Sequence, residues 1–285
     1  DAGPTFVHGH DGAVEAVDWI FNGWGAQEWA EWTNDRQIGR VVAGRAGVPV
    51  VSSMLVQEGG AIHVDGEGTV LVTETVQLDP YRNPYATRET IEAELERTIG
   101  ARKVIWLPRG LTRDYERFGT RGHVDMVATI PSPGTLLLHH QPNPDHPDHA
   151  VTKGLREFFE GTTDAAGRSW NIVDLPAPNT IRDSEGFVDY SYINHLVVNG
   201  GVVACGYGEP EADARAAEIL NAGSKVAILI GAGARGAAAG RCGRQARHFG
   251  LCGVRLGSRT GAILLHTRVG ALSPAFCQAV LTEFA

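Results

Sequence analysis

Cysteine is scarce in this sequence: there are four in 285 residues, and no two of them form a Cys-x-x-Cys pair. Such sparse cysteines argue against a secreted disulfide framework and give no signal of structural zinc or of a redox dithiol. Long apolar runs are also missing, since no stretch approaches the roughly 18 consecutive apolar residues of a membrane span. The first residues offer neither a basic n-region nor an apolar h-region. We therefore predict a cytoplasmic protein with free thiols and no association with a membrane.

Acidic residues are absent from most of the last quarter of the chain. Residues 219–282 contain no Asp or Glu but eight Lys and Arg, whereas the whole chain has 33 acidic and 25 basic residues and a formal net charge of −8. An acidic chain is a poor candidate for binding a phosphate backbone, so we expect no nucleic-acid partner and favour a cationic small molecule. The basic segment leaves one less favoured alternative open, a protein that associates with nucleic acid through this segment.

One pattern of secondary structure recurs along the chain: two short β-rich runs joined by a turn, then a helix, then another strand. Copies begin near residues 5, 61, 123 and 192. In the clearest copy, Thr87 is a predicted N-cap, Ile91, Leu95 and Ile99 share one helix face, and residues 103–107 form the closing strand.

Each ββαβ unit exposes an apolar sheet face that it cannot cover alone, so the units must pack around a shared core. A closed ring of blades satisfies this requirement, and ligands would then bind at its axis. Polar clusters around Glu58, His123 and Asn194 support the ring, because they recur 65 and 71 residues apart at the same place in each copy. We predict an α/β fold of this kind.

Three segments hold the residues that could carry chemistry. They are Asp1-Ala2-Gly3-Pro4-Thr5-Phe6, Glu58-Gly59-Gly60-Ala61-Ile62-His63-Val64-Asp65-Gly66-Glu67-Gly68-Thr69 and Gly119-Thr120-Arg121-Gly122-His123-Val124-Asp125. In combination they resemble the agmatine deiminase family, within the guanidine-modifying superfamily that also includes arginine deiminase and the Porphyromonas-type peptidylarginine deiminases. The resemblance runs from Asp1 to about Leu220, and it includes Arg82-Asn83-Pro84.

The resemblance implies a pseudo-five-fold α/β-propeller of ββαβ repeats. Its N-terminal blade is expected to be truncated and its C-terminal blade to be atypical. Residues 1–220 would form the deiminase propeller domain, and residues 221–285 a divergent basic segment. The expected role is in polyamine and putrescine biosynthesis, with a small-molecule guanidine as the partner; self-association into a homodimer is left open.

The implied reaction is hydrolysis of a guanidinium to a ureido group and ammonia, through a thiouronium intermediate on a cysteine. Carboxylates match the planar donor fork of a guanidinium, and by motif Asp1 and Asp125 look like the substrate-binding pair. His123 looks like the general acid/base, and Glu58 like the carboxylate that orients and charges it. We also expect His123 and Asp125, at i and i+2 of one strand, to point to the same face. Cysteine chemistry on a guanidinium implies neither a cofactor nor a metal.

The nucleophile is where the sequence departs from the family pattern. The family ends with a Gly-rich turn followed by His-Cys, which no segment here matches. Distance from Gly208 places the nucleophile near residue 245, where Cys242 is the nearest thiol, and Arg241 and Arg244 would favour its thiolate. A shifted reading frame or the divergence of a non-catalytic relative would each explain the loss. Two hypotheses therefore stand, a deiminase and an inactive relative that binds guanidines or polyamines.

Three further features have weaker signals. The run from His139 to His149 is rich in His and Asp, but its prolines predict a polar surface loop rather than a metal site. Trp24, Trp29 and Trp32 could line a binding site or pack in the core, and we assign Trp24 to substrate binding because an aromatic face attracts a cation. Cys205 is expected to be a buried strand residue.

Overall fold

The structure is a computed structural model that describes residues 1–9, 11–198, 201–222 and 227–231. The predictions for Cys242 and for the rest of the basic segment lie outside these residues. The chain divides into two compact units, each taken by itself below. Of the described residues, those in 1–138 and 144–173 form unit 1, and those in 139–143 and from 174 onward form unit 2.

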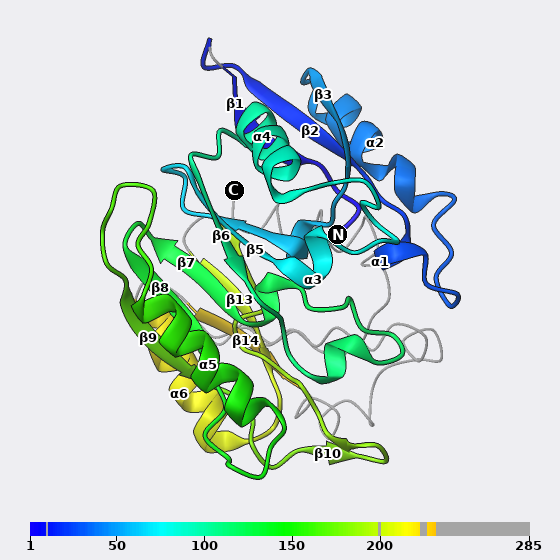
Figure 1. Cartoon of the computed structure of the whole chain (residues 1–285). Helices are drawn as coiled ribbons and strands as arrows, with labels where there is room; N and C mark the ends of the chain where they lie inside the picture. Colours follow the sequence, from blue (N-terminus) through cyan, green and yellow to red (C-terminus); the bar gives the residue numbers. More distant parts are fainter. Residues whose placement is uncertain (10, 199–200, 223–226, 232–285) are drawn as a thin grey trace, which may run out of the picture. The chain divides into compact units, whose positions relative to one another are not determined.

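The described residues form four three-stranded sheets that share the predicted order of strand, strand, helix, strand (Figure 1). The sheets are β1–β3 (Thr5–His8, Val14–Ile20, Val50–Val56), β4–β6 (Ile62–Val64, Thr69–Thr73, Lys103–Leu107), β7–β9 (Ala128–Ser132, Thr135–His140, Asn171–Pro176) and β12–β14 (His195–Val198, Gly201–Gly206, Ala227–Gly231). The helices before the third strands are α2 (Ile38–Ala46), α4 (Arg88–Ile99), α5 (Asp148–Glu160) and α6 (Pro210–Ala222). The predicted ββαβ repeat is therefore present in the described residues.

Strand direction follows from these connections. In each sheet the first two strands pair antiparallel, as a hairpin allows. The pairs β2–β3, β5–β6 and β13–β14 are parallel, and each crossover contains a helix. The short elements are α1 (Gly23–Ala26), α3 (Glu74–Gln77), β10 (Arg182–Asp183), β11 (Gly186–Phe187) and the 3₁₀ turns η1 (Asp35–Gln37), η2 (Gly59–Ala61), η3 (Arg113–Tyr115) and η4 (Val124–Met126).

Helix α4 shows how local sequence sets an element. Thr87 caps its N-terminus in a capping box with Thr90, and Gly100 ends it in the left-handed conformation at φ 70°. Ile91 and Leu95 are fully buried on the inner face, as their spacing predicts. The prediction for this helix is confirmed.

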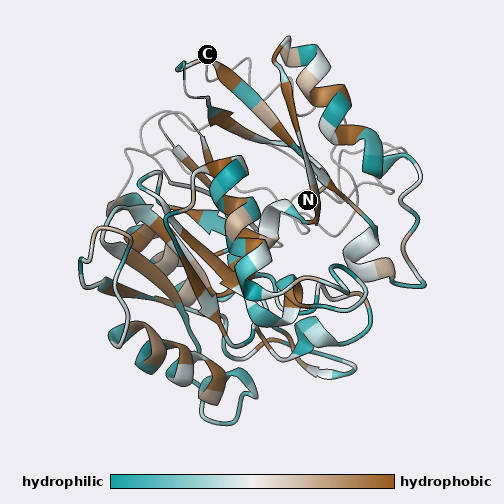
Figure 2. Ribbon diagram, turned by 45° about the horizontal axis from the view of Figure 1, so that its top comes forward, coloured by the Kyte–Doolittle hydropathy of each residue, from teal (hydrophilic) through white to brown (hydrophobic). Residues whose placement is uncertain are grey.

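The core of unit 1 has two parts that meet at the middle sheet. Strand β5 is buried along its whole length, and its alternating side chains point to opposite faces. Val70 and Val72 pack with Val17 and Trp19 of β2, while Leu71 packs in a second cluster with residues of β6–β8 and α5. Figure 2 shows the hydrophobic colour concentrated in the strands, with both colours on the helices. Neighbouring sheets of this unit thus share their cores, as expected.

The predicted strand at 123–130 is wrong at its start. Residues Val124–Met126 form the 3₁₀ turn η4, and β7 begins only at Ala128. The reason is the carboxylate of Asp114, which accepts hydrogen bonds from the backbone N–H groups of Thr120, Gly122 and His123 at 2.6, 2.7 and 3.0 Å. The N–H of His123, which lies in the predicted strand, is therefore not available to a strand ladder. The turn that follows is closed by the N–H of Val127, which donates to the carbonyl oxygen of Val124 at 3.0 Å.

The prediction of a loop for residues 139–149 is wrong at both ends. His139 and His140 close strand β8, and Asp148 and His149 open helix α5, so only the segment between them is irregular. Among the described residues, no group of three His, Cys, Asp or Glu side chains could hold a metal ion. In the same part of the chain no helix is both long and apolar enough to span a bilayer.

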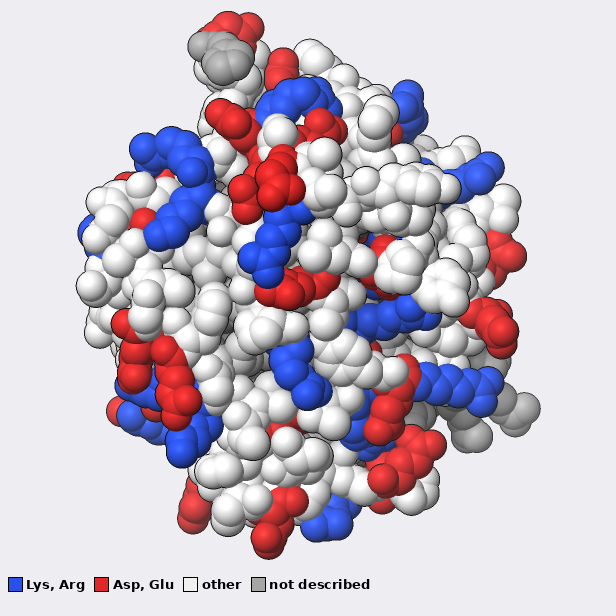
Figure 3. Space-filling view, viewed as in Figure 1, with Lys and Arg blue, Asp and Glu red and all other residues white. Residues whose placement is uncertain are grey.

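Acidic and basic side chains are interspersed on the molecular face shown in Figure 3. Among the described residues, Arg88 pairs with Glu74 and Arg97 pairs with Glu94, and both arginines are exposed. This face carries no continuous basic surface of the kind that tracks a phosphate backbone.

Candidate active site

The structure brings four of the predicted site residues together in unit 1. Asp1 precedes β1, Glu58 lies between β3 and η2, and His123 and Asp125 lie at the start of η4. Nε2 of His123 is 3.2 Å from Oε2 of Glu58, and Nδ1 of the same ring is 3.9 Å from Oδ1 of Asp125. The imidazole therefore lies between two carboxylates, although the expected strand that was to align His123 with Asp125 is absent.

Glu58 is held in its ionised form. Its side chain is fully buried, which opposes ionisation. The hydrogen bond and charge of His123 and the charge of Arg82 outweigh this effect and hold the pKa of Glu58 below its ordinary value. An ionised carboxylate only accepts hydrogen bonds, so the imidazole Nε2–H is the donor in the contact with Glu58.

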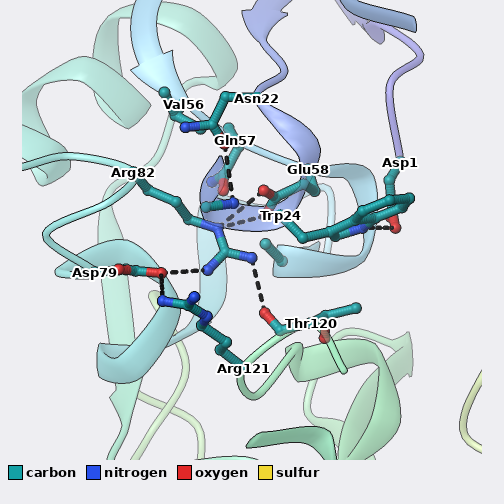
Figure 4. A network of polar contacts seen from close by, with 12 residues as sticks. Asp1, Asn22, Trp24, Val56, Gln57, Glu58, Asp79, Arg82, Thr120 and Arg121 are labelled. Atoms are coloured by element: carbon teal, nitrogen blue, oxygen red, sulfur yellow. Dashed lines mark hydrogen bonds and ion pairs between the residues drawn. The ribbon is translucent and has the colours of Figure 1, made fainter. Parts of the chain in front are cut away.

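Arg82 links Glu58 to two further partners (Figure 4). Its Nε lies 2.9 and 3.1 Å from the two carboxylate oxygens of Glu58. Nη1 donates to Oδ2 of Asp79 at 2.7 Å, and Nη2 donates to the carbonyl oxygen of Thr120 at 2.7 Å. Arg121 reaches the same Asp79 oxygen at 3.3 Å. From the sequence, Arg82 was part of a family motif only, with no predicted place beside Glu58.

Asp125 differs from Glu58 in its electrostatic surroundings. Burial raises its pKa to about 6; the charge of His123 opposes this shift, and the charge of Asp114 adds to it. About a third of the side chain, 32%, remains exposed. A cation that approached this carboxylate would favour its ionised form, so Asp125 is suited to pair with a positively charged ligand.

The second glycine of the Glu-Gly-Gly motif provides the space for this cluster. A Cβ atom on Gly60 would lie 2.5 Å from Oδ2 of Asp125 and 2.6 Å from Nδ1 of His123, closer than real Cβ contacts. The N–H of Gly60 also donates to Oδ1 of Asp1 at 3.0 Å, and the N–H of Gly59 donates to the Asp1 carbonyl at 3.1 Å. This segment thus positions Asp1 and leaves room for the other two side chains.

Trp24 lies next to Asp1 and is half-buried. Its Nε1–H donates to Oδ2 of Asp1 at 2.8 Å, its ring stacks on Trp29 at 5.2 Å, and Phe21 packs edge-on at 5.1 Å. Trp24 adopts a left-handed conformation at φ 57°, which is strained for a residue with a side chain. The three aromatic rings therefore lie beside the carboxylate cluster, joined to it by the hydrogen bond between Trp24 and Asp1. The role of Trp24 in substrate binding stays a prediction.

The cysteines do not complete the cluster within the described residues. Cys205 lies in β13 as expected, where it is half-buried, and burial raises the pKa of its thiol. A thiol with a raised pKa is a poor nucleophile, so Cys205 does not fit the role of the attacking group.

Comparison with protein families identifies the chain. A family model described as Porphyromonas-type peptidyl-arginine deiminase matches residues 1–235. The chain belongs to this family. The predicted resemblance is confirmed at the level of the family, and it extends beyond the segments that suggested it.

Relatives of this deiminase family member have names that agree with one another. A Streptomyces coelicolor protein, provisionally named agmatine deiminase, is 56% identical over 211 residues, which cover 74% of this chain and 62% of that protein. The agmatine deiminase of Pseudomonas syringae is 38% identical over 242 residues, covering 77% and 64% of the two chains. The chain thus spans less than two thirds of the length of these relatives.

Solved structures agree in fold. The agmatine deiminase of Enterococcus faecalis aligns with a TM-score of 0.69 and 31% identity, covering 78% of this chain and 66% of that chain. The Porphyromonas gingivalis structure assigned as an arginine deiminase aligns with a TM-score of 0.72 and 26% identity, covering 81% and 68%. The deiminase family member described here therefore has an α/β fold of small sheets of the agmatine deiminase type.

Proposed function

We propose that this chain hydrolyses the guanidinium group of agmatine, or of a related small guanidine, to a ureido group and ammonia. The proposal is carried by the placement of His123 between Glu58 and Asp125, at 3.2 and 3.9 Å. The name shared by the relatives, agmatine deiminase, supports the same substrate class. Such a hydrolase of C–N bonds in linear amidines would contribute to putrescine biosynthesis.

The proposed mechanism assigns each charge in the cluster a task. Asp1 and Asp125 hold the planar guanidinium through N–H···O contacts. A cysteine thiolate attacks the guanidinium carbon, and His123 donates a proton to the leaving nitrogen, so that the C–N bond breaks and ammonia departs. Water then gives a proton to His123 and attacks the thiouronium carbon. The C–S bond breaks, the thiolate is released, and the new hydroxyl loses its proton to solvent to leave the ureido carbonyl. Glu58 stabilises the imidazolium.

Cys242 is the thiol that we propose as the nucleophile. The support is its distance along the chain from Gly208 and the presence of Arg241 and Arg244 beside it, which would lower the pKa of a cysteine. The missing His-Cys segment favours a second candidate function, a relative that binds guanidines or polyamines without turnover. The two candidates differ in whether a covalent adduct can form on a cysteine.

The deciding experiment measures binding and turnover separately. Agmatine is titrated into the chain by calorimetry, and the release of ureido product and ammonia is followed in the same preparation. We expect binding, product, and a thiouronium adduct on Cys242 by mass spectrometry, with Cys242→Ser retaining binding and losing product. Binding without product or adduct would support the non-catalytic candidate. Tight binding of a peptidyl-arginine, with no binding of agmatine, would overturn the assignment of the substrate.

We extend the same proposal to the architecture and surroundings of the chain. The four observed ββαβ sheets would be blades of a pseudo-five-fold propeller, with a deiminase domain at residues 1–220 and a divergent segment at 221–285. Cytoplasmic location and absence of a nucleic-acid partner belong to this proposal, and self-association into a homodimer is left to measurement. Sedimentation of the purified chain, with and without an oligonucleotide at low salt, would test the last two points.

A further inference from the structure

A fully buried guanidinium, that of Arg82, shares the carboxylate of Glu58 with the imidazole of His123. The side chains of Arg82 and Glu58 are both 0% exposed, and that of Asp79 is 3% exposed. Burying charges in this way costs several kcal/mol per ion unless nearly every donor and acceptor is paired. Each of the three guanidinium nitrogens of Arg82 has such a partner: Nε has Glu58, Nη1 has Asp79 and Nη2 has the carbonyl of Thr120. A buried ion pair is weak evidence of a role in stability, so its position beside the acid/base pair calls for another explanation.

Arg82 reaches His123 by two separate routes. The first runs through Glu58, whose Oε2 is 3.1 Å from Nε of Arg82 and 3.2 Å from Nε2 of His123. The second runs through the backbone, because Arg82 binds the carbonyl of Thr120 in the loop that carries His123. The other side of this loop is held by Asp114, which accepts the N–H groups of Thr120 and His123. The guanidinium of Arg82 therefore contacts both groups that hold the His123 imidazole in place, the Glu58 carboxylate and the loop at Thr120.

We propose that Arg82 is the positioning residue of this site: it fixes the orientation and negative charge of Glu58 and holds the loop of His123, so that the imidazole keeps one hydrogen-bonded orientation. This inference rests on the proposed function for its effect on turnover, but its effect on Glu58 and His123 is a property of the folded chain. The planar guanidinium of Arg82 is essential to this role, since its Nε, Nη1 and Nη2 atoms each bind a different partner.

The substitutions separate this role from general stability. Arg82→Gln removes the charge and part of the fork, and Arg82→Lys keeps the charge but cannot serve three partners in one plane. Arg121→Gln is the matched control, because Arg121 contacts the same Asp79 oxygen but neither Glu58 nor Thr120 in the described contacts. Glu58→Gln, alone and combined with Arg82→Gln, tests whether Arg82 acts through the carboxylate.

The first measurement needs no enzymatic activity. The side-chain carboxyl of Glu58 is followed by carbon-13 NMR against pH, with its signal assigned from Glu58→Gln, and the Nε2–H proton of His123 is followed in the same samples. In Arg82→Gln we expect the Glu58 midpoint to move to higher pH and the ring N–H signal to be lost through exchange with water. In Arg82→Lys the Glu58 midpoint should rise less, because the positive charge is kept, but the Nε2–H signal of His123 should still be lost. Arg121→Gln should change neither the midpoint nor the signal.

The second measurement uses turnover of agmatine. In Arg82→Gln, kcat should fall by about 10- to 100-fold with little change in KM, which is part of the roughly 10²- to 10⁴-fold that general acid–base catalysis supplies. In the Glu58→Gln background the further loss from Arg82→Gln should be smaller than in the parent chain, because the route through Glu58 is already broken and only the contact with the Thr120 carbonyl is left to lose.

The outcomes distinguish this inference from the proposed function. If the parent chain shows no turnover but the NMR changes occur as stated, the proposed function fails and the positioning role stands. If Arg82→Gln leaves the Glu58 midpoint and the His123 signal unchanged, the positioning role is overturned, whatever the activity. Should Arg82→Gln fail to fold, Arg82→Lys is decisive: an unchanged ring signal in that variant rejects the inference. Equal effects of Arg82→Lys and Arg121→Gln would also reject it.

Discussion

At the scale of single residues, Asp125 shows that the site is held at a cost to stability. Its folded-state pKa of about 6 lies above the ordinary value of 3.8, so between these pH values the folded chain binds more protons than the unfolded chain. Stability therefore falls as pH rises through this window, and above pH 6 the ionised carboxylate is a net burden. The upper limit is about 3 kcal/mol at about 1.4 kcal/mol per pH unit. Exposure of the side chain reduces this figure.

Asp125→Asn should therefore stabilise the folded chain at pH 7 by about 1–2 kcal/mol, after allowance for solvent screening. The gain should be small by pH 4 and should vanish below about pH 3, where the wild-type carboxyl is protonated in both states. Urea unfolding of both proteins at pH 4 and pH 7 measures the difference. The same substitution should abolish tight binding of agmatine at pH 7 by calorimetry. A variant that is less stable at pH 7, or equally stabilised at both pH values, would contradict the electrostatic account.

Gly60 is a second residue on which the site depends, because the cluster leaves no room for a Cβ atom at this position. Gly60→Ala would force its Cβ into Asp125 and His123, and a displacement of about 1 Å can reduce activity by about 100-fold. We expect at least a 10-fold loss of agmatine affinity, measured by calorimetry. Gly59→Ala is the matched control, since its Cβ would meet nothing closer than Cα of Asp1 at 3.8 Å. Similar losses in the two variants would show that the motif is needed for a reason other than space.

At the scale of elements, two glycines with open surroundings have opposite effects on helix stability. Gly154 lies within α5 and Gly100 ends α4 at φ 70°, and a Cβ on either would meet no atom within 4 Å. Gly154→Ala should raise the free energy of unfolding by about 0.5–1 kcal/mol, because alanine in a helix interior loses less backbone conformational entropy on folding than glycine does. Gly100→Ala should lower it by about 1 kcal/mol, because a Cβ is strained in the left-handed region.

Denaturant unfolding of the two alanine variants measures both changes under the same conditions. Because neither residue contacts a neighbour through a new Cβ, packing cannot account for a difference in sign. Two stabilising substitutions would show that the end of α4 does not require the left-handed conformation.

At the scale of the whole molecule, unit 1 depends on a middle sheet, β4–β6, that is covered on both faces. Leu71 of β5 is fully buried in a cluster that joins the second and third sheets of unit 1. Leu71→Ala should cost about 2–5 kcal/mol in the free energy of unfolding, as expected for a cavity in a close-packed core. Met54→Ala is the control, because Met54 is 87% exposed and should change stability by less than about 0.5 kcal/mol. A small loss in Leu71→Ala would imply that the neighbouring sheets pack loosely.

Much of this molecule can be predicted from short-range pattern. The ββαβ order, helix α4 with its Thr87 cap, and the closing strand at Lys103–Leu107 follow from periodicity and capping, which act within a few residues. The repeat also placed Glu58 and His123 at corresponding positions of successive copies, whereas their pairing was what the family resemblance implied. Family motifs then indicated which chemistry that pair could perform, and the match of residues 1–235 confirms the family.

Only the tertiary structure decided how the cluster is held. Arg82 meets Glu58 across 24 residues, and Asp114 turns the chain at His123 into a 3₁₀ turn where the pattern predicted a strand. No period or local motif encodes these pairings, because a buried charge takes whichever partner the packing of distant segments brings to it. The sequence by itself thus determined the repeat and the family, and it predicted which groups are candidates for the chemistry. The packing of the sheets determined their orientation and their charge.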